Sequence, residues 1–439
     1  MGTVAVKSAR TARPETAAQR TELVAVVGQG YVGLPLAIRA AEVGYRVIGV
    51  DVDAQRVKKL EAGDSYVADV ASERLQTALD TGAYFATTDY ADIAGFDVCL
   101  ITVPTPLRDG APDLRHIEDA GRAIASRLRP GCTVILESTT YPGTTDELLR
   151  PLLEEGSGLR TPDDFWLGYS PERIDPGNAE WHLENTPKVV SGVNPASLEA
   201  VRSFYDRLVA RTIEVGSTRT AELTKLLENT FRHVNIALVN ELAIFAGELG
   251  ADVWEAIAAA GTKPFGFMPF TPGPGVGGHC LPIDPAYLSW QVKRKIGIQS
   301  RFIELADEIN HHMPGYVVQR VMRGLNRRRI SVNGSRVLLL GLAYKRNVGD
   351  FRESPALEVA RLLGSLGADV RAVEPYAQAT QPLPDGVSLV PFSRNELAAA
   401  DVVVVLSDHD AFDYDAVVAE ARYVFDTRHR CQGSVVETL

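Results

Sequence analysis

Short runs of wholly apolar residues alternate with stretches of helical periodicity along the chain. The first run, Leu23–Val27, leads into a glycine-rich turn and a helical stretch at 34–43, which Gly44 ends. A second run, Arg46–Val50, follows at once and ends at Asp51. Strands without alternating polar positions are typical of parallel sheets that are buried on both faces. The pattern therefore predicts a βαβ unit at the start of an α/β domain.

Later apolar runs predict further strands. Those at 98–103 and Thr133–Leu136 lead into loops rich in threonine and proline, and those at Trp166–Tyr169 and 188–191 extend the same sheet. The last third repeats the opening pattern loosely. We expect a helix at about 354–366 and strands at 336–341, 369–373, 401–406 and 423–426, the last being the final strand of the chain. This repetition predicts a second Rossmann-like domain.

Between these parts, the period of the apolar positions becomes helical. From 221 to 249 apolar side chains recur at steps of three and four, at Leu223, Leu226, Leu227, Phe231, Val234, Leu238, Leu242 and Phe245. This stretch has no proline and a glycine only near its end, so we expect one long helix that joins two domains. Apolar residues also lie on a second flank of this helix, beyond the side that packs against the domains. This second flank predicts contact with another subunit, in a homodimer or a higher homo-oligomer.

The expected architecture is α/β, with two Rossmann-like domains joined by a long central helix. We place the first domain at 21–215, a central helical part at 216–315 and the second domain at 316–439, and we expect 1–20 to be a disordered tail. The central part contains a stretch at 261–285 that is rich in glycine and proline. Loops of this length inside compact enzymes are usually functional.

Composition excludes several classes of function. The chain of 439 residues is 45% hydrophobic and 23% charged, as in soluble globular proteins, and no run reaches the roughly 18 apolar residues of a membrane helix. The net charge of −11 argues against general nucleic-acid binding. Residues 1–20 lack the apolar segment of a signal peptide, so we expect a cytoplasmic protein. We expect neither structural zinc nor a disulfide framework, because no C-x-x-C pair occurs among Cys99, Cys132, Cys280 and Cys431.

Three glycines open the first predicted helix in the pattern Gly28-x-Gly30-x-x-Gly33. The first permits a tight turn, the second lets a pyrophosphate approach the backbone, and the third lets the helix pack on the strand. The helix N-terminus adds free N–H groups. Asp51, at the end of the next strand, favours NAD over NADP because a carboxylate there bonds the ribose hydroxyls and repels a 2′-phosphate. The alternative is a turn whose glycines serve packing alone.

A second candidate site is the thiol that follows two glycines. Gly277 and Gly278 precede His279 and Cys280, which predicts an accessible thiol with room for a substrate. The alternative is a buried structural cysteine. The adjacent histidine has the wrong spacing for a metal pair, so we expect no metal site.

Two polar residues on the long helix form a third candidate. Lys225 and Asn229 are four residues apart and therefore share one face. If that face lines a cleft, the ammonium and the amide can stabilise an oxyanion. The alternative is a solvated lysine beside a surface asparagine.

Together these features resemble one known family, the nucleotide-sugar 6-dehydrogenases, which includes UDP-glucose and GDP-mannose dehydrogenases. The resemblance covers about 23–428. Besides the glycine motif and Asp51, it rests on Val103-Pro104-Thr105-Pro106, Ser138-Thr139-Thr140-Tyr141-Pro142, Ser170-Pro171-Glu172-Arg173, Ala221-Glu222-x-x-Lys225-x-x-x-Asn229, Gly277-Gly278-His279-Cys280-x-x-x-Asp284 and Gly341-Leu342-Ala343-Tyr344-Lys345. The stretches 262–267 and 272–280 resemble the N-acetylhexosamine branch, and 175–178 and 231–241 most resemble UDP-N-acetylglucosamine 6-dehydrogenases.

The resemblance implies a four-electron oxidation of a sugar C6 alcohol to a uronic acid with two NAD+. Cys280 attacks the intermediate aldehyde to give a thiohemiacetal, whose oxidation leaves a thioester that water hydrolyses. The resemblance also implies that Lys225 and Asn229 hold the oxyanion, that Asp284 positions the water or tunes the lysine, that Thr140 orients the water, and that Glu172 lies beside the reacting carbon. It further implies cofactor contacts from Tyr31, Val32, Arg56, Thr105 and Thr140, and UDP-sugar contacts from Glu172, Arg173, Gly277, Lys345 and Arg428.

The chain departs from the UDP-glucose branch at two positions. Pro176 stands where that branch has a second glutamate, and His279 replaces a different residue. Both departures agree with an acetamido sugar, and UDP-N-acetylglucosamine is the expected substrate. UDP-N-acetylmannosamine, UDP-N-acetylgalactosamine and UDP-glucose are the close alternatives, since one hydrogen bond can decide between epimers.

Two other classes of function compete with this interpretation. A two-electron hydroxyacid-type dehydrogenase also combines a Rossmann domain with a long helix and a lysine, but it does not need Cys280. A nucleotide-sugar binding protein without turnover is the other alternative, and the presence of Lys225, Asn229, Cys280 and Asp284 argues against it.

Overall fold

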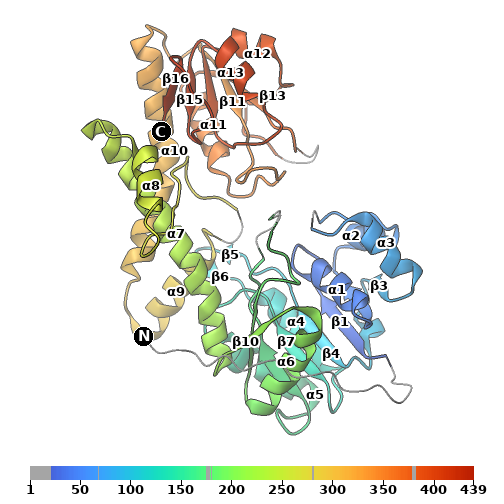
Figure 1. Cartoon of the computed structure of the whole chain (residues 1–439). Helices are drawn as coiled ribbons and strands as arrows, with labels where there is room; N and C mark the ends of the chain where they lie inside the picture. The colour runs from blue at the N-terminus through green and yellow to red at the C-terminus, as the bar shows by residue number, and fades with distance from the viewer. Residues whose placement is uncertain (1–20, 68, 175–177, 179, 279–280, 378–381) are drawn as a thin grey trace.

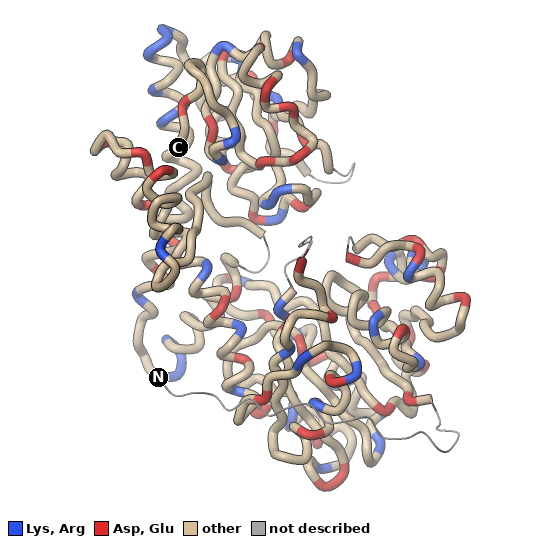
Figure 2. The backbone as a smooth tube through the Cα atoms, in the orientation of Figure 1, with Lys and Arg blue, Asp and Glu red and all other residues tan. Residues whose placement is uncertain are grey.

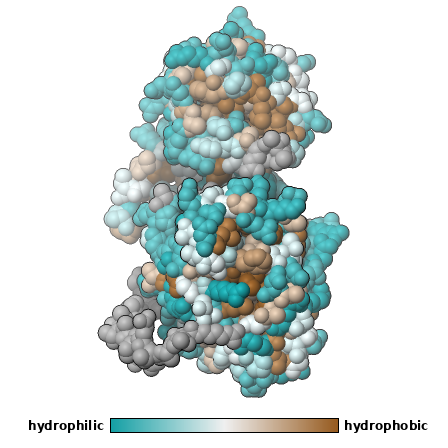
Figure 3. Space-filling view, turned by 90° about the vertical axis from the view of Figure 1, so that its right-hand side faces the viewer, coloured by the Kyte–Doolittle hydropathy of each residue, from teal (hydrophilic) through white to brown (hydrophobic). Residues whose placement is uncertain are grey.

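The computed structural model describes residues 21–67, 69–174, 178, 180–278, 281–377 and 382–439. Two α/β bodies lie at opposite ends of a helical middle part (Figure 1). In the space-filling view they are stacked with a constriction between them (Figure 3). The α/β class with two parallel sheets and long central helices is therefore confirmed. The predicted tail at 1–20 lies outside the described residues.

In the described part of the N-terminal body, eight strands form a sheet in the order β10-β9-β8-β7-β4-β1-β2-β3. Neighbouring strands are parallel except β8 and β9, which are antiparallel. The strands are β1 (Leu23–Val27), β2 (Arg46–Val50), β3 (Tyr84–Thr87), β4 (Val98–Ile101), β7 (Thr133–Leu136), β8 (Trp166–Tyr169), β9 (Lys188–Gly192) and β10 (Thr212–Glu214). The edge strands β3 and β10 were not predicted, because neither is buried throughout and neither forms a run of wholly apolar residues.

Helices cover both faces of this sheet. Along β1, Val24 and Val26 belong to one core cluster and Ala25 and Val27 to another, so consecutive side chains enter opposite layers. This explains the strand's wholly apolar sequence. The helices are α1 (Gly33–Glu42), α2 (Ala54–Glu61), α3 (Ser72–Asp80), α4 (Arg115–Ala125), α5 (Arg150–Ser157) and α6 (Pro195–Leu208), with the short helices η1 (Tyr90–Ile93) and η2 (Thr144–Leu149) and a small hairpin, β5 (Leu107–Arg108) and β6 (Ala111–Pro112).

The C-terminal body is built on a second parallel sheet, in the order β13-β12-β11-β14-β15-β16. Its elements are β11 (Arg336–Leu340), α11 (Pro355–Ser365), β12 (Asp369–Val373), β13 (Ser388–Leu389), α12 (Arg394–Ala399), β14 (Val402–Val405), α13 (Tyr414–Glu420), β15 (Val424–Asp426) and β16 (Val436–Thr438). The prediction that 423–426 is the final strand was wrong. β16 follows it at the sheet edge, where its three half-buried residues give no apolar run.

Long helices connect the two bodies. α7 (Thr218–Leu249) confirms the predicted long helix and begins three residues before it. Near its start, Ala221 and Leu226 join a core cluster of the first body, and further along Val239 and Ala243 join the core of the second. α10 (Arg301–Arg327) lies beside α7 and continues across residue 315, where we expected the second domain to follow. α8 (Val253–Gly261) and α9 (Asp284–Ile296) complete the middle part.

The surface carries both signs of charge. Lysine and arginine are interspersed with aspartate and glutamate over both bodies (Figure 2). Among the described residues, no cluster of three or more histidine, cysteine, aspartate or glutamate side chains could hold a metal ion. No helix in the described part of the chain is both long and apolar enough to cross a membrane.

Candidate active site

The glycine motif forms the turn between β1 and α1. Gly28 has a φ of +95°, and a Cβ there would lie 2.7 Å from the carbonyl oxygen of Thr102. A Cβ on Gly33 would lie only 1.8 Å from the Gly28 oxygen, whereas nothing lies within 4 Å of one on Gly30. The outer glycines are thus required by packing, and Gly30 faces open space. This arrangement fits a dinucleotide pyrophosphate at the start of α1.

Asp51 lies beside this turn, at the end of β2. One carboxylate oxygen accepts a hydrogen bond from the backbone N–H of Gln29 at 2.9 Å, and the other accepts one from Asp53 at 2.9 Å. The Arg56 guanidinium is 3.5 Å from Asp51. The carboxylate is therefore fixed next to the glycine turn, where a ribose bound to this edge would meet it.

Three other predicted cofactor contacts differ in their surroundings. The Tyr31 side chain is half exposed, and the Arg352 guanidinium of the C-terminal body lies 5.8 Å from its ring centroid. Thr105 is buried and donates a hydrogen bond to the Thr139 carbonyl at 2.8 Å, which joins the loops after β4 and β7. Val32 is the residue before α1.

Helices α7 and α9 of the middle part bring three predicted residues together. Lys225 and Asn229 project from α7, and Asp284 is the first residue of α9. The Asn229 amide donates to Asp284 Oδ2 at 2.5 Å. Burial raises the pKa of Asp284 to about 6, although Lys225 and the Asn229 amide act in the opposite direction. Lys225 is only 7% exposed, so it is not the solvated surface lysine of the alternative interpretation.

Thr140 lies in the loop after β7 and is fully buried. Its hydroxyl is 2.5 Å from that of Thr144, at the start of η2. The same short helix is held by Glu222 of α7, whose carboxylate accepts hydrogen bonds from the Gly143 N–H at 2.6 Å and from the N–H and hydroxyl of Thr145 at 2.9 and 2.7 Å. The sequence motif includes Glu222 but assigns it no role. Its role follows from residues 77 positions away, which no local pattern reveals.

Glu172 and Arg173 follow β8. Glu172 Oε1 accepts hydrogen bonds from the backbone of Arg173 at 2.6 Å and of Ile174 at 2.5 Å. Arg173 forms an ion pair of 2.7 Å with Glu228 of α7. The loop is thus tied to the same long helix that carries Lys225. Pro176, the departure noted above, lies outside the described residues.

The glycine-rich loop between α8 and α9 packs against the C-terminal body. Gly278 has a φ of +86°, and its N–H donates to the Arg352 carbonyl at 3.0 Å. A Cβ on Gly277 or Gly278 would meet Tyr344 at 2.9 or 2.7 Å. These glycines therefore allow close approach between the loop and the second body. His279 and Cys280 lie outside the described residues, which end at Gly278 and resume at Leu281.

The two remaining predicted residues lie at the carboxyl edge of the second sheet. Lys345 follows β11, and Arg428 follows β15. Arg428 donates to the Leu406 carbonyl at 2.8 Å, and its guanidinium would be 2.6 Å from a Cβ on Gly273. Gly273 in turn donates its N–H to Asn240 of α7 at 2.9 Å. One edge of the second body, the glycine-rich loop and the long helix therefore meet.

Three models of one protein family together match most of the chain. Residues 22–209 match the NAD binding domain of the UDP-glucose/GDP-mannose dehydrogenase family, 219–312 match its central domain, and 338–433 match its UDP binding domain. The chain belongs to this family. It is an NAD-dependent UDP-sugar dehydrogenase, as the sequence motifs predict.

Individual relatives of this dehydrogenase agree. It is 38% identical to a UDP-N-acetyl-D-glucosamine 6-dehydrogenase from Pseudomonas aeruginosa over 393 residues, which are 89% of this chain and 91% of the relative. It is 37% identical to a UDP-N-acetyl-D-mannosamine dehydrogenase from Pyrococcus horikoshii over 89% of this chain and 90% of the relative. The solved structure of a UDP-D-ManNAc dehydrogenase from P. horikoshii matches with a TM-score of 0.85 and 33% identity, covering 95% of this chain and 98% of that one.

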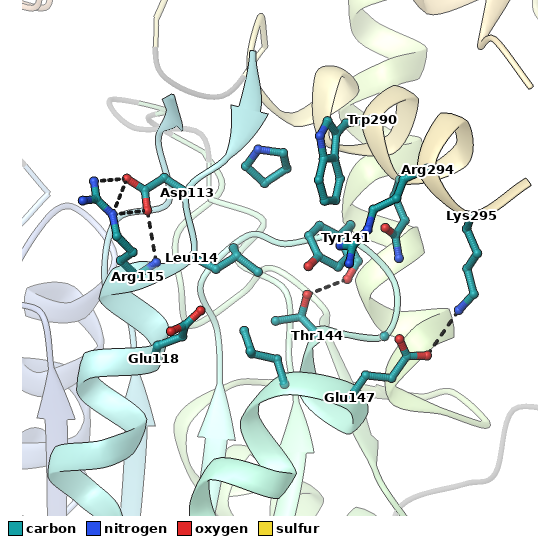
Figure 4. A pocket seen from close by; sticks show the side chains of 14 residues that line it. Asp113, Leu114, Arg115, Glu118, Tyr141, Thr144, Glu147, Trp290, Arg294 and Lys295 are labelled. Carbon is teal, nitrogen blue, oxygen red and sulfur yellow. Dashed lines mark hydrogen bonds and ion pairs between the residues drawn. The ribbon is translucent and has the colours of Figure 1, made fainter. Parts of the chain in front are cut away.

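A separate cavity of about 710 Å³ lies between α4, η2 and α9 (Figure 4). Tyr141 and Trp290 face each other there, with ring centroids 5.4 Å apart, and the Arg294 guanidinium is 5.0 Å from the Trp290 ring. None of the predicted site residues lines this cavity. The candidate active site of the dehydrogenase is therefore the cluster around Lys225, Asn229 and Asp284.

Proposed function

We propose that the enzyme oxidises the C6 alcohol of a UDP-N-acetylhexosamine, with UDP-N-acetylglucosamine as the best candidate, to the uronic acid. The observation that supports this most is the cluster of Lys225, Asn229 and Asp284, which two helices bring together and in which the lysine and the aspartate are buried. NAD+, when bound, would supply the hydride acceptor for each of the two oxidations. The glycine turn with Asp51 and Arg56 would hold it, with Tyr31, Val32 and Thr105 nearby.

In this proposal, Cys280 supplies the nucleophile. Its sulfur adds to the aldehyde carbon formed in the first oxidation, and the carbonyl oxygen becomes an alkoxide. The Lys225 ammonium and the Asn229 amide stabilise the negative charge on that oxygen. Loss of the second hydride leaves a thioester, and attack by water releases the carboxylate and the thiol.

The remaining predicted residues position the reactants. The hydrogen bond to Asp284 orients the Asn229 amide, and the carboxylate offsets the charge of Lys225. The family resemblance assigns Glu172 to a position beside the reacting carbon, and Thr140, whose hydroxyl is 2.5 Å from that of Thr144, anchors the loop after β7. We assign the UDP portion to Arg173, Gly277, Lys345 and Arg428, since the last three lie at or against the carboxyl edge of the second sheet.

The choice of sugar rests on motifs and relatives. The relative from P. aeruginosa acts by name on UDP-N-acetyl-D-glucosamine and that from P. horikoshii on UDP-N-acetyl-D-mannosamine, at nearly equal identity. The stretch 231–241 favours the first of these. UDP-N-acetylmannosamine, UDP-N-acetylgalactosamine and UDP-glucose are the other candidates.

The deciding experiment is the yield of NADH with a limiting amount of each UDP-sugar and an excess of NAD+. We expect two NADH per UDP-N-acetylglucosamine, and a Cys280→Ala variant that forms no acid. One NADH per sugar would show that oxidation stops at the aldehyde and would exclude the thioester. If only a different UDP-sugar gave two NADH, the proposed four-electron reaction would stand, but that sugar would be the substrate instead of UDP-N-acetylglucosamine.

We also propose that the enzyme is a homodimer in which α7 pairs with a second copy. The apolar residues along one flank of this helix are Leu223, Leu227, Phe231, Leu238, Leu242 and Phe245, and each is between 43% and 63% exposed. A stripe that extends over most of a 32-residue helix can pair with itself across a twofold axis. Light scattering should show a dimer for the wild type and a monomer for Leu227→Glu, a variant in which the neighbouring Glu228 is kept. A wild-type monomer would refute this assignment.

A further inference from the structure

A buried cluster of charges lies behind Glu172. Lys188, the first residue of β9, is 3% exposed, and its ammonium is 3.1 Å from Glu137 Oε2 and 3.5 Å from Glu172 Oε2. Glu137 follows β7 and is 1% exposed. Its other oxygen accepts a hydrogen bond from the Tyr205 hydroxyl of α6, and the Lys188 ammonium lies 5.2 Å from the Tyr205 ring centroid. Three charged side chains from separate segments thus meet inside the first body.

Burying these three charged groups costs the folded protein free energy of desolvation. Buried ion pairs are often no more stable than apolar side chains of the same volume, because the desolvation cost offsets the attraction. Burial raises the pKa of Glu137 and by itself lowers that of Lys188, but the two carboxylates outweigh that effect and raise the pKa of the lysine. Lys188 therefore remains protonated between two carboxylates. Stability alone gives no reason to keep it there.

The cluster fixes both oxygens of Glu172. Oε1 is held by the backbone N–H groups of Arg173 and Ile174, and Oε2 faces the Lys188 ammonium. The two hydrogen bonds to Oε1 come from the same loop that carries Glu172. Lys188 is the contact that connects the carboxylate to the sheet, since β9 is hydrogen-bonded to β8 and β10. Within the described part of the chain, the carboxylate would otherwise be anchored only to its own loop.

We propose that Lys188 is a positioning residue for the oxidation: it holds the Glu172 carboxylate at the edge of the reaction site, and Glu137 balances its charge. The proposal rests on the proposed function, in which Glu172 lies beside the reacting carbon. Lys188 itself touches neither substrate nor cofactor in this assignment. Its effect passes through Glu172 alone.

The test is a double-mutant cycle of Lys188→Met and Glu172→Gln, measured as kcat and KM with the UDP-sugar that gives two NADH. We expect Lys188→Met to lower kcat by about tenfold or more while the KM for NAD+ stays within about twofold. In the Glu172→Gln background the same substitution should change kcat little, because its partner is already neutral. Additive effects would overturn the proposal, as would a Lys188→Met enzyme with the wild-type kcat.

Two further variants separate positioning from stability. Lys188→Met combined with Glu137→Gln removes both members of the buried pair, so its melting temperature should recover while its kcat stays low. Recovery of kcat in this variant would mean that Lys188 only neutralises Glu137. Lys188→Arg should restore much of kcat, and Lys295→Met, which breaks a surface ion pair of 3.2 Å, is the control that should leave it unchanged.

The outcomes also distinguish this proposal from the proposed function. If the wild type forms two NADH per sugar but Glu172→Gln turns over at the wild-type rate, the four-electron reaction stands and the role of Lys188 is refuted. If no UDP-sugar yields two NADH, the proposed function fails before the cycle is measured.

Discussion

The amide of Asn229 on α7 and the carboxylate of Asp284 on α9 lie 55 residues apart in sequence and are joined by a hydrogen bond of 2.5 Å. This contact fixes the amide that we assign to the oxyanion, and it places a buried acid beside Lys225. Asp284 is 3% exposed, and burial raises its pKa from an ordinary value of 3.8 to about 6.

This shift predicts how stability depends on pH. In the range from about 4 to 6, the folded protein retains a proton that the unfolded chain has released, so the stabilising contribution of Asp284 is present below about pH 4 and is lost as pH rises through 6. Asp284→Asn removes this titration. Its free energy of unfolding, relative to the wild type, should therefore increase by roughly 2 kcal/mol between pH 4 and pH 8 in urea titrations. The exposed Asp163→Asn is the control, and a flat difference for Asp284→Asn would contradict the shift.

Lys225 should affect the rate rather than the fold. Loss of one oxyanion-stabilising group typically costs about 3 kcal/mol of barrier, so Lys225→Met should lower kcat by roughly a hundredfold with a small change in the KM for NAD+. Steady-state NADH formation measures this. Lys59→Met, at an exposed position of α2, should keep the wild-type kcat. A larger effect on KM than on kcat would assign Lys225 to substrate binding instead.

These residues show how far the sequence alone could lead. Lys225 and Asn229 are one helix turn apart, and Gly28, Gly30 and Gly33 lie at one turn between a strand and a helix, so periodicity and spacing were enough to predict that each set lies together. Asp284 entered only through the family resemblance, because its partner lies on another helix. The link between Glu137 and Lys188 spans about 50 residues and involves a lysine at the start of a strand, which reads as an ordinary surface position. Contacts of this kind depend on how elements pack and leave no periodic trace.

The glycine turn predicts opposite results for two similar substitutions. Gly30→Ala places its new methyl group in open space, so the protein should fold with a melting temperature near that of the wild type. The methyl group blocks the approach of a pyrophosphate, however, and the KM for NAD+ should rise by about tenfold or more. Gly33→Ala should instead lower the melting temperature by several degrees, because its methyl group would lie 1.8 Å from a backbone oxygen. An equal loss of stability in both variants would contradict this division of roles.

Glu222 connects α7 to the loop that carries Thr140. Its carboxylate accepts hydrogen bonds from two backbone N–H groups and one hydroxyl, and burial raises its pKa to about 7. Glu222→Ala leaves these donors without an acceptor and should cost about 2–4 kcal/mol of unfolding free energy. Glu222→Gln keeps one acceptor oxygen and should cost less, whereas Glu248→Ala removes an exposed carboxylate and should cost little. The hydroxyl of Thr144 contacts that of Thr140. We therefore also expect Glu222→Ala to have a lower kcat than the wild type at temperatures below its melting transition, where the variant is folded. A variant that loses stability but keeps kcat would show that η2 supports the fold without positioning the Thr140 loop.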